Sequence, residues 1–79
     1  MQVTVVLYAT LTRYHPENKG NDPFTMQLPE KAVVKDLIEK VGINEGEVKQ
    51  VFIKYRKRPE DHPLEDGDKV AFFPPVGGG

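Results

Sequence analysis

The fold is decided by the sequence KVAFFPPVGGG at residues 69–79. Its apolar side chains alternate, and this pattern predicts a strand over residues 69–73. Val70 and Phe72 then face inward, and Ala71 and Phe73 face outward. Two prolines follow at once, so the strand is expected to end at Phe73.

The residues after this strand form a tail with unusual properties. Pro74 and Pro75 cannot extend a sheet ladder, because proline has no N–H and a fixed φ, and they favour a stiff, extended chain. After Val76 there are only Gly77, Gly78 and Gly79. At ~3.3 Å per residue the six residues after Phe73 span roughly 20 Å. We therefore expect a domain over residues 1–73 and a flexible tail over residues 74–79. The tail would deliver the Gly79 carboxylate into a narrow channel. The alternative is an unstructured end or an expression remnant.

Working outward, the N-terminal half predicts two strands joined by a loop. Residues 2–10 alternate, with Val3, Val5, Leu7 and Ala9 on one face and Thr4, Val6, Tyr8 and Thr10 on the other. Residues 13–23 are polar and contain two prolines and a glycine, which is typical of a loop. Residues 24–28 predict a second strand, antiparallel to the first.

The middle of the chain predicts one helix. Apolar side chains recur at Val34, Leu37, Ile38 and Val41, which is the spacing of a helix with one buried stripe. Gly42 is suited to end it. The N-cap is weak, since Lys31 or Ala32 stands where Ser, Thr or Asp is preferred. One further helical turn is expected within residues 44–49.

The C-terminal half completes an α+β fold. Residues 50–55 predict a third strand with Val51, Ile53 and Tyr55 on one face, residues 56–60 a charged turn, and Asp66-Gly67 another turn. One helix covers one face of a four-stranded sheet, so the other face stays open. That face carries four apolar groups, enough to mark a docking surface: Val6, Tyr8, Phe52 and Phe73. The alternative is that loops or self-association cover it.

The composition narrows the classes of function. The absence of cysteine excludes disulfides, thiolate metal sites and a cysteine nucleophile, and it is compatible with a cytoplasmic protein. A formal net charge of −1 gives no global attraction to nucleic acid. No apolar run approaches the ~20 residues that span a bilayer, and the N-terminus lacks the features of a signal peptide.

Residues 61–79, DHPLEDGDKVAFFPPVGGG, resemble the C-terminal signature of the MoaD/ThiS sulfur carriers. Residues 7–11 and 28–37 agree with this family more loosely. Within the family, the likeness is strongest to small subunits of molybdopterin synthase, where Phe-Pro-Pro-Val and a terminal Gly-Gly are typical. The resemblance implies a ubiquitin-like β-grasp with a mixed sheet of four to five strands.

The resemblance also implies a mechanism. Gly79 would be adenylylated by an E1-like activating enzyme, which uses the ATP, and then converted to a thiocarboxylate. Gly77 and Gly78 would thread the channel, and the partner-binding residues would be Tyr8, Phe52, Phe73, Pro74, Pro75 and Val76. A large subunit would hold the chemistry, so this chain would have no catalytic side chains, no bound cofactor and no metal. Sulfur transfer to thiamine or cysteine synthesis, a ubiquitin-like modifier and a plain binding module are the alternatives.

The sequence departs from the family at two places that bear on its partners. Residue 77 is Gly, where Ala, Ser or Thr is frequent. Arg56-Lys57-Arg58 follows the third strand, where many relatives have Asn-Gly or an apolar contact. Pro16 makes a helix after the first strand unexpected, although some relatives have one there.

The other candidate residues favour structural roles. His15 and His62 have no second ligand at metal spacing. Lys54 and residues 56–58 form a basic cluster, typical of a solvated strand edge, with contact to an acidic partner or to nucleotide phosphates as the alternative. The turn carboxylates are expected to accept local hydrogen bonds: Asp61, Glu65, Asp66 and Asp68.

Overall fold

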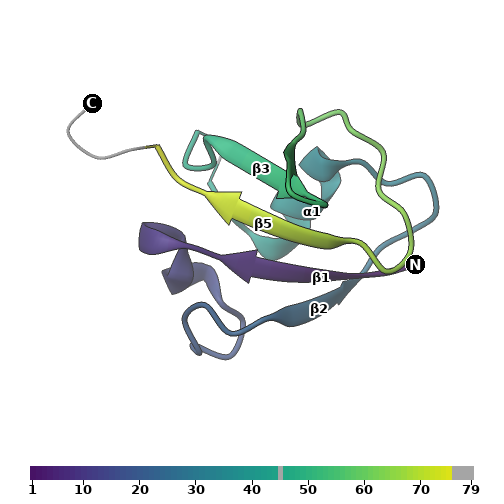
Figure 1. The fold of residues 1–79 in the computed structure, drawn as a ribbon. Coiled ribbons are helices and arrows are strands. Elements are labelled where there is room, and N and C mark those ends of the chain that lie inside the picture. The colour runs from purple at the N-terminus through teal and green to yellow at the C-terminus, as the bar shows by residue number, and fades with distance from the viewer. Residues whose placement is uncertain (45, 76–79) are drawn as a thin grey trace.

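A computed structural model describes residues 1–44 and 46–75 of the chain. Figure 1 shows a twisted sheet whose last strand leads to the C-terminal end. The elements in chain order are β1 (Gln2–Leu7), the 3₁₀ helix η1 (Ala9–Tyr14), β2 (Phe24–Gln27), α1 (Val34–Val41), β3 (Gln50–Ile53), β4 (Arg56–Lys57) and β5 (Lys69–Phe73).

The strands form one mixed five-stranded sheet in the order β2-β1-β5-β3-β4. The first and last strands of the chain, β1 and β5, pair in parallel at its centre, with Val5 opposite Val70 and Leu7 opposite Phe72. The β1–β2, β3–β5 and β3–β4 pairs are antiparallel. The predicted mixed sheet and the predicted antiparallel pairing of the first two strands are therefore confirmed.

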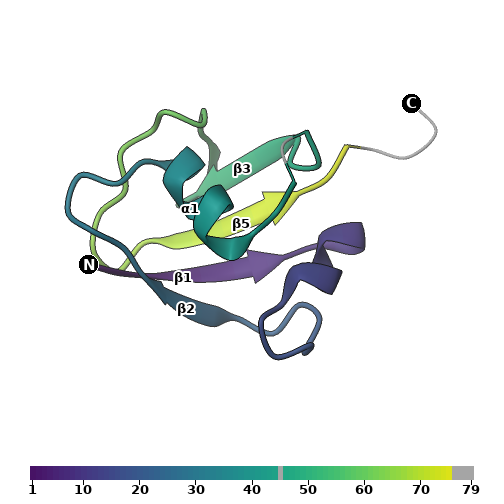
Figure 2. The same cartoon turned by 180° about the vertical axis from the view of Figure 1, so that it is seen from behind.

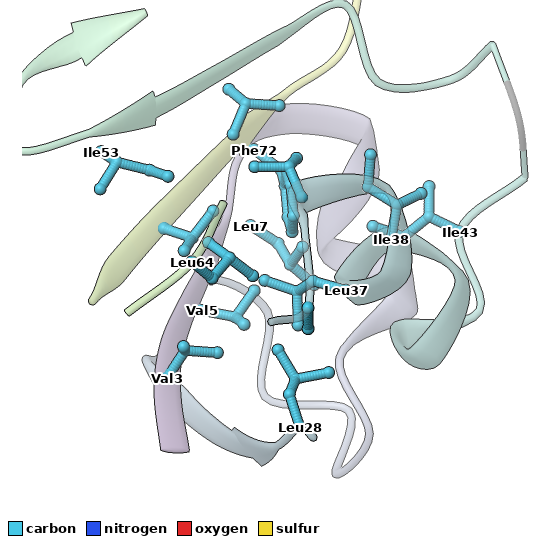
Figure 3. Packing of buried hydrophobic residues seen from close by; sticks show 14 of the residues in the cluster. Val3, Val5, Leu7, Leu28, Leu37, Ile38, Ile43, Ile53, Leu64 and Phe72 are labelled. Atoms are coloured by element: carbon cyan, nitrogen blue, oxygen red, sulfur yellow. The ribbon is translucent and has the colours of Figure 1, made fainter. Parts of the chain in front are cut away.

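The core lies between the sheet and α1, which crosses one face (Figure 2). From β1 it takes the alternate residues Val3, Val5 and Leu7, and from α1 it takes Leu37 and Ile38, all at most 6% exposed (Figure 3). The strand alternation and the helical spacing in the sequence predicted that these side chains are buried. Burying each such side chain contributes about 1.5–3 kcal/mol, so packing against the sheet stabilises a helix of only eight residues.

The ends of α1 are set by one carboxylate and one glycine. The N-cap residue is Val33 and not Lys31 or Ala32 as predicted, but the cap is weak as expected, because the Val33 side chain cannot accept a hydrogen bond. The Asp36 carboxylate compensates by accepting the Val33 N–H at 2.9 Å. Gly42 ends the helix with φ +93°, a left-handed conformation that glycine adopts without steric cost.

The prediction for the segment after β1 is wrong in two respects. The strand ends at Leu7 rather than residue 10, and the 3₁₀ helix η1 follows where Pro16 made a helix unexpected. Pro16 does not oppose η1, because the helix ends at Tyr14, before the proline. Leu11, fully buried, fastens the helix to the core.

The prediction for residues 54–60 is also wrong. Lys54 and Tyr55 form a two-residue turn, and Arg56 and Lys57 return as β4, paired with Ile53 and Phe52. Both turn residues have positive φ, +54° and +67°, as a type I′ hairpin requires. Tyr55 therefore does not share the inward face of β3 and is 99% exposed. The expected helical turn within residues 44–49 is, in its described residues, a bend and turn in which the Glu47 N–H donates to the Asn44 carbonyl at 3.1 Å.

The strained hairpin turn yields a first prediction. Tyr55→Gly and Tyr55→Ala both remove an exposed ring, but only glycine adopts the positive φ without steric cost. We expect Tyr55→Gly to be more stable than Tyr55→Ala by about 1 kcal/mol. Urea unfolding of the two variants measures the difference. Equal stabilities would show that the turn stores no such strain.

Candidate functional site

The sheet face turned away from α1, here called the open face, is organised by strand register. Ala71 lies opposite Val6 on one side and Phe52 on the other, and Phe52 lies opposite Lys57. Directly paired residues point to the same face of a sheet, so these four side chains form one row across it. The face is hollowed by a groove of about 660 Å³, lined by Val6, Tyr8, Phe52, Lys54, Tyr55, Gly67, Asp68, Lys69, Ala71 and Phe73.

Three aromatic rings meet at the end of β5. The Tyr8 ring stacks on Phe73, with centroids 4.5 Å apart and planes inclined by 4°. Phe52 meets Phe73 edge to face at 5.5 Å. Offset and edge-to-face contacts are the favourable arrangements for aromatic pairs. The structure thus brings together Tyr8, Phe52 and Phe73, which the sequence assigns to partner binding.

The tail begins directly at this cluster. The Phe73 carbonyl accepts the Lys49 N–H at 2.8 Å and ends the paired part of β5. Pro74 is half-buried and Pro75 is exposed, as expected for prolines that leave the ladder. The other predicted tail residues lie outside the described part of the chain: Val76, Gly77, Gly78 and Gly79.

A charged cluster joins η1 to the segment before β3. The Glu47 carboxylate accepts hydrogen bonds from the Tyr14 hydroxyl and the Arg13 guanidinium. These hydrogen bonds hold the pKa of Glu47 below its usual range, and the bond from Tyr14 has the largest effect. The same carboxylate raises the pKa of Arg13. This cross-link connects η1 to the loop in which the Lys49 N–H donates a hydrogen bond to the Phe73 carbonyl.

The remaining candidate residues act on the backbone or in the core. His15 is buried, accepts the Glu17 N–H at Nδ1 and meets the Phe24 ring edge to face. The Asp68 carboxylate accepts the Glu65 N–H, and that of Asp66 accepts the Gln2 N–H, each at 2.8 Å. Within residues 1–44 and 46–75, no group of three or more His, Asp or Glu side chains is arranged to hold a metal ion.

Comparison with known proteins identifies the family. Residues 12–79 match the ThiS family. The chain belongs to this family. A putative molybdopterin converting factor subunit 1 from Pyrococcus furiosus is 31% identical, with a TM-score of 0.73, over 96% of this chain and 99% of that chain. The resemblance seen in the sequence and the β-grasp fold that it implies are both confirmed.

Two further relatives bear on the family. The molybdopterin synthase sulfur carrier subunit of Escherichia coli is 84% identical over 19 residues, a match that spans 24% of each chain. The complex of subunits 1 and 2 of molybdopterin-converting factor from Helicobacter pylori contains a chain that this ThiS-family protein matches with a TM-score of 0.62 and 22% identity. That match covers 100% of both chains. No helix in the described ranges of the chain has the length and apolar character to cross a membrane.

Sequence reasoning missed part of the groove lining in this ThiS-family protein. Ala71 was placed outward but not assigned to the site, although strand register puts it beside Phe52. Lys54 was assigned to a basic cluster but not to a groove, and Tyr55 was placed on the inward face, because the turn that directs both residues to the groove lacks the Asn-Gly or Asp-Gly signal. Alternation within β5 puts Lys69 on the same face as Ala71 and Phe73, but Lys69 was not assigned to the site.

The Glu47 cluster yields a second prediction. A carboxyl group whose pKa is lowered in the folded state contributes stability above its unfolded pKa and loses it as the pH falls. We therefore expect wild type to melt at a higher temperature than Glu47→Gln near neutral pH. This gap should narrow as the pH falls below the ordinary glutamate pKa of about 4.3. Thermal unfolding across this pH range measures it.

Glu39→Gln is the matched control, because Glu39 is exposed on α1 and forms no salt bridge within the described residues. Its melting temperature should follow wild type at each pH. A Glu47→Gln gap that does not depend on pH would contradict the assigned role of the carboxylate.

Proposed function

We propose that this ThiS-family chain is a sulfur carrier for molybdopterin biosynthesis, with its C-terminal Gly79 as the reactive group. The observation that carries the proposal is the end of β5. The strand runs through the sheet centre to Phe73, whose ring belongs to the open face, and the Pro-Pro-Val-Gly-Gly-Gly tail follows directly. The named relatives support the pathway, since two are subunits of molybdopterin synthesis proteins.

The chemistry needs an activated carboxyl group. A carboxylate is a poor electrophile, so its oxygen first attacks the α-phosphorus of ATP, releasing pyrophosphate and forming an acyl-adenylate. Hydrosulfide, supplied by a sulfur donor, then attacks the acyl carbon; the C–S bond forms as the C–O bond to AMP breaks, and loss of the proton leaves a thiocarboxylate on Gly79. This group is anionic at neutral pH and its sulfur is a strong nucleophile. The sulfur then passes to the pterin precursor, and hydrolysis restores the carboxylate.

The partners supply the catalytic groups. We propose an E1-like adenylyltransferase, which binds the ATP, and a large molybdopterin synthase subunit, which binds the precursor. This chain is then a carrier subunit and not an enzyme by itself. The solved complex of subunits 1 and 2 from H. pylori supports the large-subunit partner. We place the process in the cytoplasm, where ATP is available to the activating enzyme.

The body of the protein presents the tail. We propose that Tyr8, Phe52 and Phe73 dock the partner while Pro74 and Pro75 direct the chain away from the sheet. Val76 and residues 77–79 then enter the partner's channel. The absence of side chains in the glycines allows close approach of the partner's backbone.

The proposal is tested at the C-terminus. Deleting Gly78 and Gly79 should leave the melting temperature unchanged and abolish thiocarboxylate formation, because the reactive carboxylate is no longer presented at the correct length. Intact mass is measured after incubation with the activating enzyme, ATP and a sulfur source. Wild type should gain the mass of one oxygen-to-sulfur exchange.

A matched control adds one alanine after Gly79, which keeps every native residue but displaces the carboxylate. This extended chain should also remain unmodified. Exchange of oxygen for sulfur in either variant would contradict the proposal. A ladder of lysine-linked conjugates in cell extract, without sulfur exchange, would support a protein modifier instead.

A further inference from the structure

The open face carries positive charge although the whole chain has a net charge of −1. Alternate residues of each strand point to this face, and the two charged ones are both lysines: Lys57 in β4 and Lys69 in β5. The uncharged open-face positions in the five strands are Gln2, Thr4, Val6, Thr25, Gln27, Gln50, Phe52, Ala71 and Phe73. The Lys54 side chain adds a third cation at the groove.

These three ammonium groups are available to a partner. Lys54, Lys57 and Lys69 are all exposed, and none forms a salt bridge within residues 1–44 and 46–75. Asp68 is the one carboxylate among the groove residues in the described part of the chain. It is only 7% exposed, and it accepts the Glu65 N–H. The accessible charge among the residues that line the groove is therefore positive.

We propose that the large-subunit partner meets the open face with an acidic surface. Its carboxylates would lie opposite Lys54, Lys57 and Lys69, and its apolar side chains would enter the groove that Phe52 and Phe73 line. This inference rests on the proposed function, which supplies the partner, and adds the chemistry by which that partner is recognised. The cations lie on the face that carries Phe73, the residue before the tail, so a partner that they orient would lie beside the start of the tail.

The physical effect of this arrangement is on the rate of association. Charges at the edge of an interface steer diffusional encounter, and their effect weakens as salt screens them. They also reject partners whose facing surface is basic, because like charges brought together are unfavourable. The apolar groove supplies contact area common to many partners, whereas the lysines select among them.

The test compares two charge-reversed double variants. Lys57→Glu/Lys69→Glu alters the open face, and Lys35→Glu/Lys40→Glu alters exposed positions on α1 across the sheet. Each substitution lowers the charge by two, so both variants go from −1 to −5. Lys54 is left unchanged because its positive φ supports the hairpin turn. Any difference between the variants then reflects where the charge lies.

Association with the isolated large molybdopterin synthase subunit of the same organism is measured by stopped flow at about 0.05 M and 0.5 M salt. At low salt we expect the open-face variant to associate at least about 10-fold more slowly than wild type. The α1 variant should stay within about 2-fold, and the difference should largely disappear at high salt. If the glutamate variant does not fold, Lys57→Gln/Lys69→Gln replaces it. We expect this variant to show a smaller loss of association rate with the same salt dependence.

Several outcomes would overturn the inference. Equal slowing of both variants would show an effect of net charge alone, and no slowing or faster association would show a partner that is not acidic. Absence of wild-type binding to the large subunit would also overturn the inference. The inference is also overturned if the open-face variant no longer binds a fluorescein-labelled oligoribonucleotide that wild type binds, while its rate of association with the large subunit is unchanged. That result would assign the lysines to nucleic-acid binding.

The inference and the proposed function fail in different ways. If wild type associates with the expected salt dependence but never exchanges oxygen for sulfur, the acidic docking surface stands and the carrier chemistry is refuted. If wild type and the open-face variant both gain sulfur and associate at equal rates, the carrier chemistry stands and the acidic docking surface is refuted.

Discussion

The parallel pairing of β1 with β5 is the interaction on which the rest of the structure depends. It joins the two ends of the chain at the centre of the sheet, and every other strand adds outward from this pair. Contacts beyond the paired residues extend it at both ends, because Thr4 N–H donates to the Asp68 carbonyl and Tyr8 N–H donates to the Phe72 carbonyl. Since these partners are more than sixty residues apart, the tail's origin becomes defined only when the whole domain closes.

The period of two in β5 then separates stability from function. Val70 and Phe72, both fully buried, belong to the core under α1. Their neighbours Ala71 and Phe73 lie on the open face, where Phe73 contacts Tyr8 and Phe52. The strand that holds the sheet together therefore also carries the aromatic cluster and leads into the tail. Core packing therefore positions Phe73, the residue from which the tail starts.

The sequence predicted the parts of this arrangement that depend on local periodicity. Alternation placed Val3, Val5 and Leu7 inside, helical spacing placed Leu37 and Ile38 inside, and the same alternation placed Tyr8, Phe52 and Phe73 together on the open face. The errors arose where tertiary closure overrides local preference. Ala9, Lys54 and Tyr55 adopt positive φ without being glycine, and nothing in their side chains signals it. The sequence also predicted the basic cluster of Lys54 and residues 56–58, with an acidic partner as one alternative, but it did not group Lys69 with them, because only the sheet order brings β5 beside β3 and β4.

In the proposed function, the body of the protein folds without residues 76–79, and the tail serves the partners. Native-state amide hydrogen exchange on the full chain and on a chain ending at Pro75 tests this most directly. If the central β1–β5 pair depends only on the body, the amides of Thr4, Val6, Val70 and Phe72, which face the partner strand in this pair, will exchange at the same rates in both proteins, near the limit set by global unfolding. Faster exchange at these amides after truncation would show that residues 76–79 stabilise the core, and would contradict the claim that they are presented to a partner.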